Sequence, residues 1–486
     1  MIYIRRLHPI TWFFLAVLIN TQTHRVVANE LQLPDMGNTA DYAVSPIEEK
    51  KTGEAVIRNI RRGGGVVDDP LIEGYLDHLG YRLISNSSHT EQDFKFFLIN
   101  DKALNAFALP GGFIGINYGL ILTADREGEL ASVMAHEVAH ITQRHHVRAF
   151  EHGHSQGPIL AALIAAMILG AGNSEIGEAA FAATAAGMME SNINFTRSNE
   201  KEADYIGITM LANAGYDPME MASFFSRLDK ASRLYGSTVP EFLRSHPFSA
   251  NRMADAQSRA RSLKQKKKTF DKLSFHLIQA RIRALSHENP NQAVSEFEKR
   301  ITSKSYKNRI AEQYGYALSL IKSGQLNKAN IILNRLLKND PNRIAYLVAK
   351  GELENSGKKI TKSQSTYTKA LELYPDNKVI IYYYAQNLLK NRQFSKARSL
   401  LNKVLKTPDN LPQLYKFLSE AESGLGNASG VHHAMAEYYF YQGQAHEAIR
   451  QMQLAMKADN KSDFYTTARR EARLVEYQKE IITKLD

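Results

Sequence analysis

The sequence predicts an α+β domain followed by an all-α solenoid of helical repeats. Compact apolar and aromatic runs, which favour strands, occur between residues 94 and 116 and are flanked by helical patterns. Beyond residue 270 the patterns are helical throughout, and small residues recur at a spacing near 34. We therefore expect a targeting segment at 1–28, the α+β domain at 29–265 and the solenoid at 270–486.

Length and composition limit the classes of protein to which the chain can belong. With 486 residues, 44% of them hydrophobic, it is long enough for two or more domains with sizeable cores. It contains no cysteine, which excludes disulfides and cysteine-bound zinc and leaves histidine and carboxylate as metal ligands. The net charge of +11 suits an acidic partner or peripheral contact with an anionic membrane surface. There is no arginine–aromatic motif typical of nucleic-acid binding, so we expect no nucleic-acid partner.

The N-terminus has the features of a signal peptide. A positively charged start (Arg5, Arg6) precedes an apolar run at 12–19, which is too short to span a bilayer. Val26 and Ala28 fit the −3 and −1 positions of a cleavage site. We expect cleavage after Ala28 and export of the mature protein. An uncleaved anchor is the alternative, and the shortness of the run disfavours it.

The motif His136-Glu137-Val138-Ala139-His140 has the form H-E-x-x-H. Positions i and i+4 share a helix face, so His136 and His140 can bind one metal ion. Glu137 beside them can take a proton from a metal-bound water, which is the zinc metalloprotease arrangement. The lack of proline and of internal glycine between residues 128 and 148 supports a helix here. The alternative is an amphipathic helix with ordinary histidines, because the five-letter pattern also occurs by chance.

A zinc peptidase needs a third protein ligand, and residues 197–205 supply a candidate. Three ligands and one water leave the catalytic position open. Glu200 and Asp204 are four positions apart and share a face, whereas Glu202 points elsewhere. We assign Glu200 to the zinc, and we expect Asp204 to accept a hydrogen bond from a ligand histidine or to lie near the leaving amine. A solvated charged helix is the alternative.

His246 and Arg252 follow in a glycine-poor, loop-like stretch. As a fourth ligand, His246 would displace the catalytic water and hold the enzyme latent. Otherwise His246 and Arg252 could bind the oxyanion of the tetrahedral intermediate. A plain surface histidine is the third interpretation.

Residues 105–116 are predicted to form a β-hairpin around the turn Pro110-Gly111-Gly112. Gly115, inside the second strand, suggests a close approach of another backbone. We expect the run Ile114, Gly115, Ile116 to be an edge strand that receives an extended peptide substrate. An ordinary hairpin is the alternative.

Two further segments near the motif leave alternatives open. The four histidines between positions 145 and 154 could form a second metal site, but a polar continuation of the helix and a loop are favoured. Residues 158–189 are largely apolar and carry a glycine-containing break. A helical hairpin is expected there, either buried or with an apolar tip that touches membrane or an unfolded client.

The C-terminal half has the periodicity of tetratricopeptide repeats. Pro341 and Pro375 are 34 residues apart, and Ala329 and Ala397 are separated by twice that interval. Small residues at such positions let paired helices pack closely, although the match is degenerate between 411 and 426. We expect roughly four repeats and an extra helix. Solenoids of this kind bind peptides or proteins.

Together these motifs resemble the gluzincin peptidases, a group that includes the CAAX prenyl protease and the heat-shock protease HtpX. The resemblance rests on H-E-x-x-H, on the later E-x-x-x-D, on the upstream Asn-Ala-Phe-Ala-Leu-Pro-Gly-Gly and on His-Pro-x-x-x-x-Arg. It implies that His136, His140 and Glu200 bind zinc and that Glu137 is the general base. It also implies that Asp204 assists as a proton donor and that His246 gates the site.

A signal peptide and a C-terminal repeat region make the chain similar to a periplasmic branch of that family. The branch implies chaperone-like activity and quality control in outer-membrane β-barrel assembly, with unfolded or stalled barrel proteins as clients and the barrel-assembly machinery as partner. The prediction is thus a periplasmic zinc endopeptidase with one zinc per chain and a protein-binding solenoid. A chaperone or assembly scaffold with a latent protease site is the rival function, and a metal-free pseudoenzyme is a further one.

Overall fold

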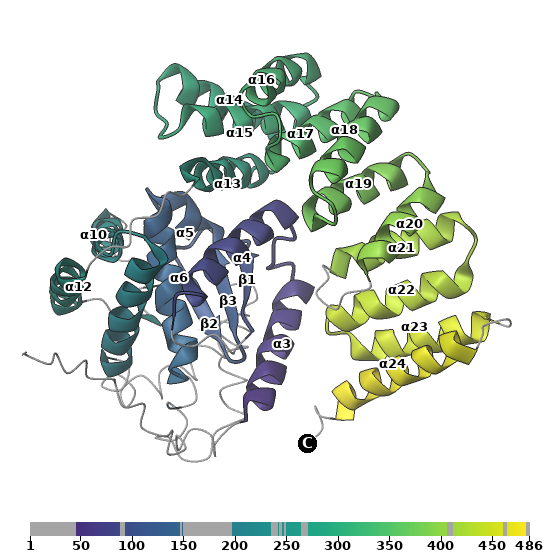
Figure 1. Cartoon of the computed structure of the whole chain (residues 1–486), viewed down its shortest axis with the longest axis horizontal. Coiled ribbons are helices and arrows are strands. Elements are labelled where there is room, and N and C mark those ends of the chain that lie inside the picture. Colours follow the sequence, from purple (N-terminus) through teal and green to yellow (C-terminus); the bar gives the residue numbers. More distant parts are fainter. Residues whose placement is uncertain are drawn as a thin grey trace, which may run out of the picture.

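The computed structural model describes residues 45–87, 93–145, 148, 197–234, 242, 245–246, 249–263, 271–405, 412–459 and 464–482. The predicted signal peptide, the apolar stretch at 158–189 and three of the four clustered histidines lie outside these residues. An α+β unit is followed by a helical solenoid (Figure 1), which confirms the predicted fold class. Within the described ranges, no helix has both the length and the apolar character needed to cross a membrane.

The α+β unit begins with two helices that start at capping residues recognisable in the sequence. Ser45 accepts a hydrogen bond from the Glu48 N–H, and the Glu48 side chain accepts one from the Ser45 N–H, which is a capping box. Asp69 caps the second helix, directly before Pro70. The elements of the unit are α3 (Pro46–Arg62), α4 (Pro70–Ile84), β1 (Lys95–Ile99), β2 (Ala106–Leu109), β3 (Phe113–Asn117), α5 (Tyr118–Thr123), α6 (Glu127–Thr142), a helix over residues 197–214, α10 (Met219–Leu234) and α12 (Ala250–Ser262).

The sheet has the strand order β1-β3-β2, with β1 parallel and β2 antiparallel to β3. The predicted hairpin is confirmed, and its turn places Gly111 and Gly112 at φ values of 78° and 92°, which favour glycine. The prediction that Ile114, Gly115 and Ile116 form an edge strand is wrong, because β3 is the central strand. The close approach at Gly115 is that of a neighbouring ring: a Cβ there would lie 2.4 Å from Cζ of Phe107.

Helix α6, which carries the H-E-x-x-H motif, is the centre of the core. It is buried from Gly128 to Ile141. It packs on β2, α4 and α10, and the cluster around it includes Leu130, Met134 and Val138. A helix buried on every side holds its polar side chains in fixed surroundings, so the motif residues cannot turn to solvent.

The solenoid confirms the repeat prediction. Ala329 and Ala397 are fully buried between helices, and Gly324 and Gly443 adopt φ values of 78° and 73° at turns. In the described part of this region the helices form six consecutive pairs, more than the roughly four repeats and extra helix expected, because α21 and the helices after it complete further pairs. They are α13 (Lys272–Leu285), α14 (Pro290–Thr302), α15 (Arg309–Lys322), α16 (Leu326–Asn339), α17 (Ile344–Ser356), α18 (Ile360–Leu373), α19 (Lys378–Lys390), α20 (Phe394–Val404), α21 (Pro412–Gly424), α22 (Ala428–Tyr441), α23 (Ala445–Ala458) and α24 (Phe464–Ile482).

The solenoid curves around the α3–α4 side of the first unit (Figure 1) and touches it at separated places. Near its start, α13 packs against α4 and α5, and α19 packs against α4. A buried ion pair joins Arg281 of α13 to Asp69, with Nη2 2.7 Å from Oδ2. Towards its far end, Gly443 lies against α3, where an added Cβ would be 2.4 Å from Cβ of Arg58. The two units are therefore packed together along the arc.

Candidate metal centre

Four potential metal ligands converge inside the α+β unit. His136 and His140 come from α6, Glu200 comes from the helix over 197–214, and His246 lies just before α12. One ligand atom from each lies within 4.8 Å of the others, and all four residues are buried. The structure thus brings together residues that are as much as 110 positions apart in the sequence.

The spacing of the donor atoms fits a tetrahedral metal. His136 Nε2 and His140 Nε2 are 3.0 Å apart, and each lies 3.3 Å from a carboxylate oxygen of Glu200. His246 Nδ1 lies 2.9 Å from Glu200 Oε1 and 3.3 Å from His136 Nε2. Ligands bound to zinc at about 2.0–2.1 Å in tetrahedral geometry are separated by about 3.3 Å. The donor set, three imidazoles and one carboxylate, is also one that zinc prefers.

Asp204 and Arg252 hold the ligands in place. Asp204 Oδ1 lies 3.0 Å from Nδ1 of His136, so that Nδ1–H can donate to the carboxylate and Nε2 remains free for a metal. Arg252 donates from Nε to Asp204 Oδ2 at 2.7 Å and pairs with Glu200 Oε2 through Nη1 at 2.8 Å. These contacts match the predicted acceptor role of Asp204. The Arg252 guanidinium faces the carboxylates of Asp204 and Glu200. An oxyanion-binding role would require it to face the substrate instead.

The pKa directions fit a site that is complete only with a cation. Burial lowers the pKa of His140 well below its ordinary value and keeps it neutral, as a metal ligand must be. Burial also lowers the pKa of His136, but hydrogen bonds with Asp204 and Glu200 outweigh it and raise the value to about 10. Burial raises the pKa of Asp204, yet bonds from His136 and Arg252 bring it below its usual value. Asp204 is therefore ionised at neutral pH, which favours an acceptor over a proton donor.

Glu137 is placed as a base would be. Its side chain is 1% exposed, and neither carboxylate oxygen has a hydrogen-bond partner. Burial raises the pKa of Glu137, and the electrostatic effects of the neighbouring imidazoles oppose that rise. His246 Nε2 lies 3.5 Å from Glu137 Oε1 while its Nδ1 faces Glu200. His246 therefore stands between the base and the metal ligands, where a catalytic water would lie.

β2, and not β3, is the edge strand beside this centre. Helix α6 packs more closely on β2 than on β3. The main chain of Ala108 in β2 faces the Glu137 carboxylate, beyond the geometry of a hydrogen bond, and acts to lower its pKa. No further strand pairs with β2 in the part of the chain that the structure describes.

Sequence reasoning missed two residues of the centre. The sequence favours a polar continuation of the helix and a loop for His145, and a direction away from the centre for Glu202. In the structure His145 Nδ1 lies 2.9 Å from His140 Nδ1, and its Nε2 lies 3.1 Å from Glu202. The signal available in the sequence is a third histidine five positions after His140.

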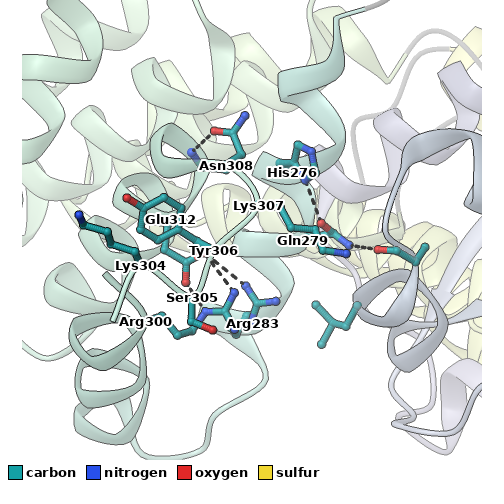
Figure 2. A pocket seen from close by; sticks show the side chains of 13 residues that line it. His276, Gln279, Arg283, Arg300, Lys304, Ser305, Tyr306, Lys307, Asn308 and Glu312 are labelled. Carbon is teal, nitrogen blue, oxygen red and sulfur yellow. Dashed lines mark hydrogen bonds and ion pairs between the residues drawn. The ribbon is translucent and has the colours of Figure 1, made fainter. Parts of the chain in front are cut away.

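A separate hollow of about 470 Å³ lies at the junction of the two units and contains none of the four metal-ligand candidates (Figure 2). It is lined by α5, α13 and the segment joining α14 to α15. Three of its cations have partners within the chain: Arg300 pairs with Glu312, Arg283 with Glu296 at 3.5 Å, and Lys307 with Asp125. The hollow is thus a polar contact zone between the units, distinct from the metal centre.

An H-E-x-x-H helix, a carboxylate from a second helix and a repeat solenoid define a metallopeptidase joined to tetratricopeptide repeats. Residues 70–260 match the model of Peptidase family M48, and residues 358–421 match a tetratricopeptide repeat model. A relative from Vibrio cholerae is 37% identical over 425 residues, which cover 86% of this chain and 87% of the relative. The beta-barrel assembly-enhancing protease of Escherichia coli is 32% identical over 418 residues, 86% of this chain and 85% of that protein. The chain belongs to the beta-barrel assembly-enhancing protease family and is a metalloendopeptidase.

More distant relatives match a smaller share of the chain. The mitochondrial metalloendopeptidase OMA1 of Schizosaccharomyces pombe is 27% identical over 197 residues, which are 40% of this chain and 56% of that protein. Among solved structures, a tetratricopeptide repeat protein from Parabacteroides merdae is 12% identical and covers 57% of this chain and 99% of its own, with a TM-score of 0.27. That score is too low to support an argument.

Proposed function

We propose that the chain is a periplasmic zinc-dependent endopeptidase that acts in the quality control and assembly of outer-membrane β-barrel proteins. The observation that carries the proposal is the convergence of two imidazole nitrogens and a carboxylate at tetrahedral spacing beside an unpartnered buried glutamate. The family name supports barrel assembly as the process. A targeting segment at 1–28 supports the periplasm.

In this proposal His136, His140 and Glu200 hold one zinc ion, which would polarise the scissile carbonyl and acidify a bound water. Glu137 would take a proton from the attacking water and pass it to the leaving nitrogen. The raised pKa of Glu137 suits both steps, because a carboxylate that binds a proton more readily is a better base and then a usable acid. Asp204 keeps His136 in the tautomer that presents Nε2, and Arg252 fixes Asp204 and Glu200.

His246 makes the resting site latent in this proposal. It fills the fourth donor position, where the catalytic water must bind, and it also contacts Glu137. For cleavage it has to withdraw from both groups together. Its ring packs against Phe242, with centroids 4.7 Å apart, so that withdrawal also disturbs the buried Phe242 contact. A latent protease is also compatible with the rival function, in which the chain serves as a chaperone or assembly scaffold.

We further propose that clients add to the β2 edge in an extended form. An extended peptide can pair with the free side of an edge strand through main-chain hydrogen bonds. β2 lies next to Glu137, whereas β3 is shielded by both neighbours. Unfolded or stalled barrel proteins are suitable clients because their strands are unpaired before assembly. The solenoid would bind clients or the barrel-assembly machinery.

The test is cleavage of an unfolded outer-membrane barrel protein by the purified mature chain loaded with zinc. Wild type, Glu137→Gln and His246→Ala are compared, with His276→Ala as a histidine control outside the centre. We expect Glu137→Gln to be inactive and His246→Ala to cleave faster than wild type. Failure of every variant to cleave, with zinc bound, would refute the protease proposal and favour the scaffold function.

A further inference from the structure

The imidazole of His140 is supported from behind by a second imidazole. His145 lies just beyond the end of α6, is 3% exposed, and places its Nδ1 2.9 Å from His140 Nδ1. The two rings meet edge to face, with centroids 4.8 Å apart and planes at 80°. On its other side, His145 Nε2 lies 3.1 Å from Oε2 of Glu202. The same carboxylate oxygen accepts a bond from Arg148 Nη2 at 3.2 Å.

The backbone turns sharply to bring His145 there. Helix α6 ends at Thr142, and Arg144 has a φ of 50°, in the left-handed region that a residue with a side chain seldom adopts. The turn is fastened to α3, because Arg144 Nε donates to Glu49 Oε1 at 2.9 Å. An unfavourable conformation held in this way indicates that the surrounding structure fixes the position of the next residue. The next residue is His145.

The hydrogen bonds have a single consistent direction. His140 presents Nε2 to the other donor atoms, 3.0 Å from His136 Nε2, so its Nδ1 carries the proton of the neutral ring. That N–H donates to Nδ1 of His145, which leaves the His145 proton on Nε2. The Nε2–H in turn donates to Glu202. Every group in this chain is satisfied in its neutral or ordinary form, and the reverse direction would place a proton on the atom that must bind metal.

We propose that His145 and Glu202 are positioning residues that hold His140 in its metal-binding tautomer and orientation, and so set the metal affinity of the centre. The inference rests on the proposed metal site. The two ligand histidines are supported differently: His136 by a carboxylate directly, and His140 through an intervening imidazole. One helix, over 197–214, supplies Glu200 as a ligand and both supporting carboxylates.

The experiment measures the zinc dissociation constant of the full mature chain by competition with a chromophoric chelator. We expect His145→Ala to weaken binding by about 10- to 100-fold, the usual effect of removing a group that orients a ligand. Glu202→Ala should weaken it less, and Glu202→Gln less again, because an amide oxygen still accepts from His145. The matched control is Asp255→Ala in α12. It removes the exposed ion-pair partner of Lys201, the residue next to Glu202, and should leave zinc binding unchanged.

Thermal unfolding of the metal-free variants distinguishes the positioning role of His145 and Glu202 from a role in fold stability alone. If His145→Ala folds poorly, Glu202→Ala decides, because the Glu202 side chain is 37% exposed and its loss leaves no buried cavity. Wild-type zinc affinity in Glu202→Ala and His145→Ala would overturn the positioning role alone. Absence of zinc binding by the wild type would overturn the proposed metal site and this inference with it.

Discussion

Arg281 offers the sharpest test of how the two units are held together. Arg281 is 3% exposed. Its Nε donates to both carboxylate oxygens of Asp69, at 3.0 and 2.9 Å, and its Nη2 donates to Oδ2 at 2.7 Å. The guanidinium also donates to the hydroxyls of Tyr314 and Tyr383. Arg281→Met removes the cation and leaves the Asp69 carboxylate buried. Breaking a buried ion pair in this way typically costs about 3–5 kcal/mol.

The structure favours the lower end of that range. After the substitution Asp69 keeps the N–H donors of Leu71 and Ile72 and the hydroxyl of Tyr383 at 3.3 Å, so the carboxylate is not left without partners. We expect Arg281→Met to lower the free energy of unfolding by about 3 kcal/mol. Adding Asp69→Asn should restore part of the loss, because asparagine caps a helix as well as aspartate and carries no charge.

The measurement is urea unfolding followed by circular dichroism, since the single tryptophan lies in the predicted signal peptide at Trp12. Arg283→Met is the control. It lies on the same helix and pairs with Glu296, which is 37% exposed, and at 3.9 Å with the buried Glu312. Glu312 keeps Arg300 as a partner, so the loss of Arg283 should cost about 1 kcal/mol or less. Equal destabilisation by the two substitutions would refute the reasoning. Metal affinity should be unchanged in both variants.

Three other outcomes follow from the structure. Burial raises the pKa of Glu73 from 4.5 to about 7, so the folded state binds a proton that the unfolded state releases, and stability falls as pH rises between these values. Glu73→Gln should therefore raise the free energy of unfolding by roughly 1–2 kcal/mol at pH 8 and hardly at pH 4, and an equal gain at both pH values would contradict this. Gly115→Ala should lower the free energy of unfolding by about 1–3 kcal/mol, because the new methyl group would collide with the Phe107 ring. Gly74→Ala, which has open space around it on helix α4, should raise the free energy of unfolding by about 0.5–1 kcal/mol in the same assay. Prolonged chelation should abolish cleavage by His246→Ala, and added zinc should restore it; cleavage that survives chelation would exclude a metal mechanism.

Local patterns were sufficient for the motif helix and the repeats. H-E-x-x-H defines its own geometry because i and i+4 share a helix face, and His136 and His140 indeed meet. The repeat spacing predicted buried alanines such as Ala329, since each repeat packs on its neighbours in sequence. In both cases the interacting residues are close along the chain or recur at a fixed interval.

Non-local pairing was beyond the same reasoning. The hairpin of β2 and β3 was predicted from its turn, but nothing in those residues shows that β1 pairs in parallel with the other side of β3. Gly115 suggests the close approach of another backbone, but the space beside it is occupied by the ring of Phe107. His145 was overlooked because its approach to His140 depends on the left-handed turn at Arg144, which no helical periodicity predicts.

The contact of Gly443 with Arg58 couples the last repeats of the solenoid to the α+β unit. In an open array each repeat feels only its neighbours, and the last repeat is energetically remote from the first. Here the arc is fixed to the α+β unit near its start, at α19 and again near its end, so it forms a closed loop of contacts. Removing or inserting one repeat would not simply shorten or lengthen a rod; it would break the closure. Repeat number in this chain is therefore a fixed dimension, set by the size of the unit that the arc encloses.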